Sequence, residues 1–128
     1  MGSFMKRIYL LGQVEPNLQD ILDYLPDTMV LHETLSVLVA TTNKKAAMTI
    51  KLRDIRASEL IVCFLPQKYS MTAEDVFTLS FAAGLGKQLA FVSEMKEVSP
   101  HIIFFEAFPY LVFNDLDELV EYIRLDVR

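Results

Sequence analysis

Short, uninterrupted apolar runs alternate along this chain with longer stretches of helical periodicity, and this alternation limits the fold more than any other feature. Residues 8–12 and 60–65 are the clearest apolar runs; the first ends in Gly12 and the second precedes Pro66. Continuous apolar runs of this length are typical of strands that are covered on both faces. Helical stretches between such strands are typical of βαβ units. The sequence therefore predicts an α/β fold with a parallel sheet.

The same pattern predicts five strands and four helices. The strands are expected at residues 8–12, 28–32, 60–65, 89–93 and 110–113, and the helices at 17–25, 43–58, 72–85 and 115–125. Thr72 and Asn114 are the expected N-caps of the last two helices, because short polar side chains satisfy the first amides of a helix. Residues 33–42 are left open between an extended and a turn-rich connection. Residues 94–109 are expected to form a loop with a short helix.

The length of the chain, 128 residues, suits one domain, because separate cores form only above roughly 250 residues. We expect residues 5–128 to form this domain and residues 1–4 to be a disordered leader. The longest apolar run, residues 60–66, is far shorter than the roughly 18 residues that span a bilayer. The single cysteine, Cys63, fits a reducing compartment and is expected to pack in the core. These features predict a soluble cytoplasmic protein with no membrane partner.

The charge distribution excludes some partners. The formal net charge is −5, whereas nucleic-acid binders carry an excess of Lys and Arg that faces the phosphates. A local basic cluster nevertheless consists of Lys44, Lys45, Lys51, Arg53 and Arg56. This cluster is either a solvated helix face or an anion site, and the solvated face is the simpler interpretation.

Metal and cofactor motifs are missing from the sequence. His32 and His101 have no metal-ligand spacing around them, and Cys63 is the only cysteine. No P-loop, dinucleotide fingerprint or nucleophile-elbow motif occurs. We therefore expect no metal and no cofactor.

The expected topology selects one edge of the sheet for a ligand. Parallel α/β sheets bind ligands at the carboxyl ends of their strands, near the point where the strand order reverses. Here the first strand ends at residues 9–13, and the third strand leads into the polar loop 66–72 and the start of a helix. The amides of a helix start favour anions. The loop is therefore either an anion site or a surface turn with an N-cap.

Four segments, taken in order, resemble one family of enzymes. They are Ile-Tyr-Leu-Leu-Gly at residues 8–12, Leu-Arg-Asp-Ile-Arg-Ala-Ser-Glu-Leu-Ile-Val at 52–62, Phe-Ala-Ala-Gly-Leu-Gly-Lys at 81–87 and Phe-Asn-Asp-Leu-Asp-Glu-Leu at 113–119. Together they are similar to the nucleoside 2-deoxyribosyltransferase superfamily, which includes the deoxynucleoside 5′-monophosphate N-glycosidases. The resemblance implies a flavodoxin-like, Rossmann-like three-layer sandwich with a parallel five-stranded sheet. It also implies a homodimer, for which the apolar segment 102–108 is a candidate contact.

The resemblance carries three site positions onto this chain, and two of them have changed. The family's tyrosine is present as Tyr9, whereas its glutamate falls on Thr78 and its aspartate on Lys51. A carboxylate can attack or support an oxocarbenium-like sugar carbon, and a threonine hydroxyl without an adjacent base cannot replace it. Asp75 lies about one helical turn before Thr78, and an alternative register places the family's Thr-Ala-x-Glu pattern on residues 72–75.

Three hypotheses for the function follow. The first is a nucleoside- or nucleotide-binding protein with lost or reduced N-glycosidic cleavage. Its pocket is expected to contain Tyr9, Gly12, Gln13, Lys51, Pro66, Lys68, Ser70, Thr72 and Thr78. The second is an active deoxyribosyltransferase or N-glycosidase that uses Asp75 as its carboxylate and Tyr9 as the hydroxyl that orients it. The third is a non-catalytic protein-interaction module, because a fold does not determine a function.

The replacement of an acid by Lys51 changes the expected charge of the ligand. Lys51 would lie beside a loop that offers Lys68, Ser70 and Thr72. A site suited to a developing cation then becomes one suited to an anion. A nucleoside monophosphate is therefore expected to bind more tightly than its nucleoside.

Overall fold

The strands of this protein form a parallel sheet. The structure is a computed structural model, and it describes residues 7–14, 17–32, 44–65, 71–93 and 110–126. The strands are β1 (Arg7–Gly12), β2 (Met29–His32), β3 (Leu60–Leu65), β4 (Gln88–Ser93) and β5 (Tyr110–Phe113). They lie in the order β2-β1-β3-β4-β5, and each neighbouring pair is parallel. This arrangement confirms the predicted α/β fold with a parallel five-stranded sheet.

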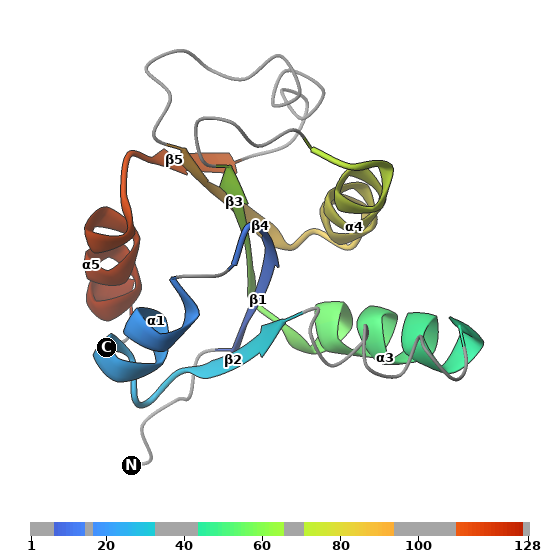
Figure 1. The fold of residues 1–128 in the computed structure, drawn as a ribbon, viewed down its shortest axis with the longest axis horizontal. Helices are drawn as coiled ribbons and strands as arrows, with labels where there is room; N and C mark the ends of the chain where they lie inside the picture. The colour runs from blue at the N-terminus through green and yellow to red at the C-terminus, as the bar shows by residue number, and fades with distance from the viewer. Residues whose placement is uncertain (1–6, 15–16, 33–43, 66–70, 94–109, 127–128) are drawn as a thin grey trace.

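Helices cover both faces of the sheet and complete the three layers (Figure 1). They are α1 (Leu18–Tyr24), α3 (Lys44–Ala57), α4 (Ala73–Gly84) and α5 (Leu116–Asp126). α1 and α5 lie on one face, and α3 and α4 lie on the other. Because strand side chains alternate between faces, Tyr9 and Leu11 pack in the layer of α3 and α4, whereas Leu10 packs toward α1 and α5. Cys63 is buried in the core, as predicted.

The ends of the helices and strands agree closely with those predicted from the sequence. Each described helix and strand begins and ends within one residue of its predicted bounds. Thr72 is the N-cap of α4, as predicted. Because apolar runs and capping residues act within a few positions of the chain, the sequence alone reveals them.

The predicted N-cap of α5 is wrong by one residue. Asp115, and not Asn114, caps the helix, because the Asp115 carboxylate accepts a hydrogen bond from the amide of Glu118 at 2.9 Å. The Glu118 carboxylate in turn accepts one from the amide of Asn114 at 2.8 Å. A side chain at the N-cap reaches the amide of the third helical residue, and position 115 stands at that distance from Glu118.

Some sequence predictions lie outside the described residues. These are the leader at 1–4, the connection at 33–42, and the loop at 94–109 with its apolar segment 102–108. None of the helices in the described ranges combines the length and the apolar character needed to cross a membrane.

The strand order reverses at the carboxyl ends of β1 and β3, because β1 lies between β2 and β3. Gly12 stands at this point with a φ of 80° and pairs with Phe64 of β3. A Cβ atom at Gly12 would lie 2.4 Å from the carbonyl oxygen of Phe64. The next amide, that of Gln13, donates to the same oxygen at 3.1 Å. Glycine therefore allows the chain to leave the sheet where ligands of such folds bind.

Candidate functional site

Tyr9 lies in the core between β1 and the layer formed by α3 and α4. Its side chain is fully buried, and its hydroxyl oxygen is shielded from solvent. It packs in the same cluster as Leu79 and Ala82 of α4 and Ile55 of α3. The sheet therefore directs Tyr9 to the face that also carries the other candidate residues on the two helices.

Thr78 is buried on α4, and its hydroxyl is committed to the helix backbone. The side chain is fully buried, and Oγ1 donates a hydrogen bond to the carbonyl oxygen of Glu74 at 2.9 Å. Threonine commonly satisfies its hydroxyl this way inside a helix. At the position where the family resemblance places a carboxylate, the chain thus has a small, locally satisfied hydroxyl.

Thr72 and Asp75 form a capping box at the start of α4. The Thr72 hydroxyl accepts a hydrogen bond from the amide of Asp75 at 3.1 Å, and the Asp75 carboxylate accepts one from the amide of Thr72 at 3.0 Å. Asp75 is buried. Each residue thus supplies a hydrogen-bond acceptor for the backbone amide of the other, which stabilises the start of the helix. The Asp75 carboxylate is therefore part of the helix start.

Lys51 joins α3 to α4 through an ion pair. Its Nζ lies 2.8 Å from Oε1 of Glu74, in the first turn of α4. The Lys51 residue is 1% exposed. The interpretation of the basic cluster as a solvated face is therefore wrong for this residue, because the face of α3 that carries it packs inward.

The other described members of the basic cluster do face solvent. Lys45, Arg53 and Arg56 are exposed. The Arg56 guanidinium lies 5.5 Å from the centre of the Phe81 ring, and the Arg56 carbonyl accepts a hydrogen bond from Nζ of Lys87 at 2.7 Å. For these residues the solvated helix face is the correct interpretation.

The structure places several of the predicted site residues on one side of the sheet. Lys51 lies on α3, Asp75 and Thr78 lie on α4, and Thr72 caps α4, all on the same side of the sheet as Tyr9. Gly12 and the exposed Gln13 mark the carboxyl end of β1. Pro66, Lys68 and Ser70 lie outside the described residues.

The sequence does not identify Glu74 as a residue of the site or as the partner of Lys51. The two residues are separated by 23 positions and belong to different helices. Spacing along one helix reveals partners three or four residues apart and no others. Only the packing of α3 against α4 identifies Glu74 as part of this site.

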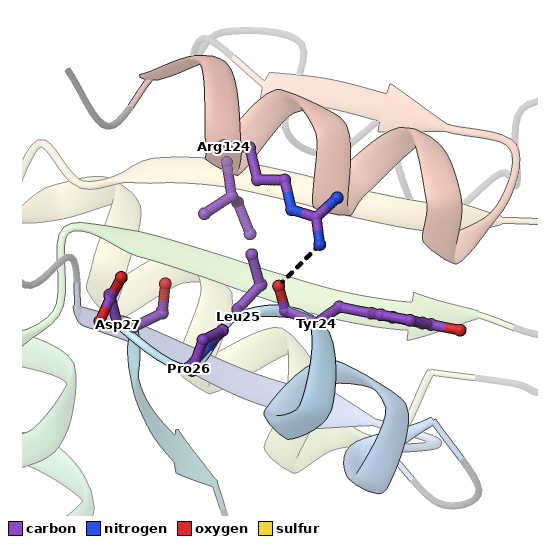
Figure 2. A pocket seen from close by; sticks show the side chains of 7 residues that line it. Tyr24, Leu25, Pro26, Asp27 and Arg124 are labelled. Carbon is purple, nitrogen blue, oxygen red and sulfur yellow. Dashed lines mark hydrogen bonds between the residues drawn. The ribbon is translucent and has the colours of Figure 1, made fainter.

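Within the described ranges, neither a group of metal ligands nor the cavity beside α5 adds to this site. Among the described residues, no three His, Cys, Asp or Glu side chains are grouped to hold a metal ion. A cavity of about 330 Å³ lies instead between the turn after α1 and helix α5 (Figure 2). Arg124 reaches across it and donates to the carbonyl oxygen of Tyr24 at 3.0 Å. This cavity lies at the amino-terminal edge of the sheet, away from the strand-order reversal.

Comparison with solved structures finds the same fold in one N-glycosidase and in two 2-deoxyribosyltransferases. A CMP N-glycosidase from Clostridium botulinum superposes with a TM-score of 0.61 at 15% identity, over 93% of this chain and 99% of that one. A 2-desoxiribosyltransferase from Leishmania mexicana gives 0.63 at 21% identity, over 92% and 96%. A 2-deoxyribosyltransferase from Bacillus psychrosaccharolyticus gives 0.72 at 16% identity, over 91% of each chain. No protein-family model and no curated protein sequence matches the chain. The fold implied by the sequence resemblance is thereby confirmed.

Proposed function

We propose that this protein belongs to the nucleoside 2-deoxyribosyltransferase superfamily and binds a nucleoside or nucleotide, with N-glycosidic cleavage lost or strongly reduced. The observation that carries the proposal is the state of Thr78, whose buried hydroxyl donates to the carbonyl of Glu74 where a carboxylate is expected. The fold shared with a CMP N-glycosidase and two 2-deoxyribosyltransferases supports a nucleoside or nucleotide as the ligand.

The ligand would lie at the strand-order reversal, between the end of β1 and the start of α4. Gly12 and Gln13 form the β1 side of this position, and Thr72 caps the helix on the other side. Lys51 supplies a buried cation at the contact between α3 and α4. In this proposal the sugar and base lie toward Tyr9 and Gln13, and the phosphate lies toward Lys51.

The active-enzyme alternative requires Asp75 to act as the carboxylate. Its Oδ2 atom accepts the amide of Thr72, and its side chain is buried against the helix start. Attack on a sugar carbon through Oδ2 would remove this oxygen from the cap, and losing a capping interaction costs roughly 0.5–2 kcal/mol. The geometry of Asp75 therefore favours loss of catalysis.

Matched titrations test the pocket and its charge preference. Cytidine 5′-monophosphate is expected to bind about tenfold more tightly than cytidine, because one charge-assisted hydrogen bond is worth roughly 1.5 kcal/mol or more. Isothermal titration calorimetry of the wild type with both ligands and their 2′-deoxy forms measures the difference. Since Lys51 is buried, salt should weaken this preference less than it weakens an exposed ion pair.

One variant tests whether Lys51 causes the preference for the monophosphate, and a second variant is its control. Lys51→Met replaces the ammonium by an unbranched apolar side chain one atom shorter and removes the charge, so the advantage of the monophosphate should disappear. Arg53→Met removes an exposed charge from the same helix and should leave it unchanged. Equal affinities of the wild type for the two ligands would exclude the anion site, and absence of binding to every nucleoside and nucleotide tried would exclude the pocket.

A homodimer is the expected assembly. The family resemblance implies subunits that complete each other's pockets, and the apolar segment 102–108 contains Ile102, Ile103, Phe104, Phe105 and Phe108. Sedimentation velocity at micromolar concentration should give twice the chain mass of 14.6 kDa. Phe104→Glu should shift the species toward the monomer by placing a charge in an apolar contact. A wild-type mass equal to that of one chain would rule out a shared pocket.

A further inference from the structure

The two partners of the Lys51–Glu74 ion pair differ greatly in exposure. The Lys51 side chain is 2% exposed, and the Glu74 side chain is 64% exposed. The ammonium is held in place by the packing of α3, whereas the carboxylate reaches it from solvent at the first turn of α4. The Lys51 ammonium is therefore buried in the interior, whereas its partner, the Glu74 carboxylate, is exposed to solvent.

This asymmetry determines which partner can leave. A buried ammonium is costly unless an anion accompanies it. A mostly exposed carboxylate keeps much of its hydration in the pair and regains the rest when it moves into water. Any other anion that reaches Lys51 can thus replace Glu74, whereas nothing can replace Lys51 without unpacking α3.

Only the Glu74 side chain has to move for such an exchange. Its backbone carbonyl is held by the hydroxyl of Thr78, one turn further along the helix, at 2.9 Å. The capping box of Thr72 and Asp75 independently fixes the start of α4. Ala73 and Glu74 stand in the first turn, where helix amides lack acceptors within the helix and favour an anion.

We infer that Glu74 is a displaceable internal anion: its carboxylate occupies the position at Lys51 Nζ that a phosphate group takes, and phosphate binding releases it into solvent. This inference rests on the proposed function for the identity of the ligand, a nucleoside monophosphate. Phosphate recognition is then an exchange of one anion for another. Removing the charge of Glu74 should strengthen phosphate binding, although Glu74 lies in the site.

Titration of four proteins with three probes tests the exchange. The proteins are the wild type, Glu74→Gln, Lys51→Met and Glu121→Gln, which removes an exposed carboxylate from α5 on the opposite face of the sheet. The probes are inorganic phosphate, cytidine 5′-monophosphate and cytidine. Glu74→Gln should bind both phosphate-bearing probes roughly tenfold more tightly than the wild type. The phosphate then forms its charge-assisted hydrogen bond with Lys51 without first displacing a carboxylate, and one such bond is worth roughly this factor. Its affinity for cytidine should not change.

The controls separate the charge of Glu74 from general electrostatics. Glu121→Gln should behave as the wild type, although it changes the net charge by the same amount. Lys51→Met should lose the preference for the phosphate-bearing probes, and adding Glu74→Gln to the same chain should not restore it. Should Glu74→Gln fail to fold, Glu74→Asp provides the second variant: its carboxylate is one methylene shorter, reaches Lys51 less well, and should also tighten phosphate binding, by a smaller factor.

The outcomes distinguish this inference from the proposed function. The exchange is overturned if Glu74→Gln and Glu74→Asp bind phosphate no more tightly than the wild type does. This holds whether or not nucleosides bind. Tighter phosphate binding in these variants, with no binding of cytidine or its monophosphate beyond that of phosphate, supports the exchange and contradicts the proposed nucleotide ligand. An equal gain in Glu121→Gln would also overturn it, because the effect would then come from net charge.

Discussion

Gly12→Ala is expected to destabilise the protein by about 2–5 kcal/mol, a large share of the roughly 5–15 kcal/mol that stabilises a typical domain. An alanine at a φ of 80° is strained by roughly 1–2 kcal/mol. Its Cβ would also lie 2.4 Å from the carbonyl oxygen of Phe64, and overpacking of this kind costs roughly 1–3 kcal/mol. Because that oxygen is backbone in the central strand β3, it has little freedom to move away. Chemical denaturation measures the loss.

Two other glycines separate the two causes. Gly86 has a φ of 76° with no atom within 4 Å of an added Cβ, so Gly86→Ala should show the backbone strain alone. Gly84 is helical and equally open, so Gly84→Ala should be neutral or stabilise the protein by up to about 1 kcal/mol. A loss in Gly12→Ala no larger than that in Gly86→Ala would show that the close approach to Phe64 contributes nothing.

No release of free base is expected from deoxynucleosides, nucleosides or their monophosphates. Without a carboxylate at position 78, turnover should be at least roughly 10³-fold slower than in an enzyme that has its nucleophile. Thr78 is buried and hydrogen-bonded within α4, and Asp75 is part of the capping box. Chromatographic detection of base after prolonged incubation is the measurement, with an active 2-deoxyribosyltransferase as the positive control.

Substitutions in the capping box decide between the remaining mechanisms if base is released. Asp75→Asn retains a capping oxygen and removes the charge, whereas Thr72→Ala removes half of the cap and leaves the carboxylate in place. Release that disappears in Asp75→Asn and persists in Thr72→Ala would establish the active-enzyme alternative. Release that survives Asp75→Asn would contradict both the proposed loss of N-glycosidic cleavage and the mechanism that uses Asp75.

The site shows where sequence reasoning reaches its limit. The sequence predicts Thr72 as an N-cap because the contact of its hydroxyl with the amide of Asp75 spans only three residues. The sequence groups Lys51 with solvated lysines and arginines, because several basic residues lie within a few positions of it on the same helix, and those described are exposed. Burial depends on which helix face meets the sheet and on what lies opposite. Its partner Glu74 is 23 residues away, and no local pattern connects them.

The one-residue error at α5 has a similar origin. Asn114 and Asp115 are both good capping residues, so the local sequence permits either helix start. The position of Glu118, whose carboxylate accepts the amide of Asn114 while its own amide donates to Asp115, selects the second. Two adjacent candidates with nearly equal intrinsic preference are separated only by the geometry of the folded turn.

The order of helices and strands, the parallel sheet and the reversal point beside Gly12 were determined by the sequence alone. They depend on apolar periodicity, caps and glycine, whose effects extend over a few residues. The tertiary structure alone decided that Lys51 is interior and that Glu74 is its partner. These states depend on the docking of α3 against α4 and on the water that this contact removes, and residues distant in the sequence contribute to both.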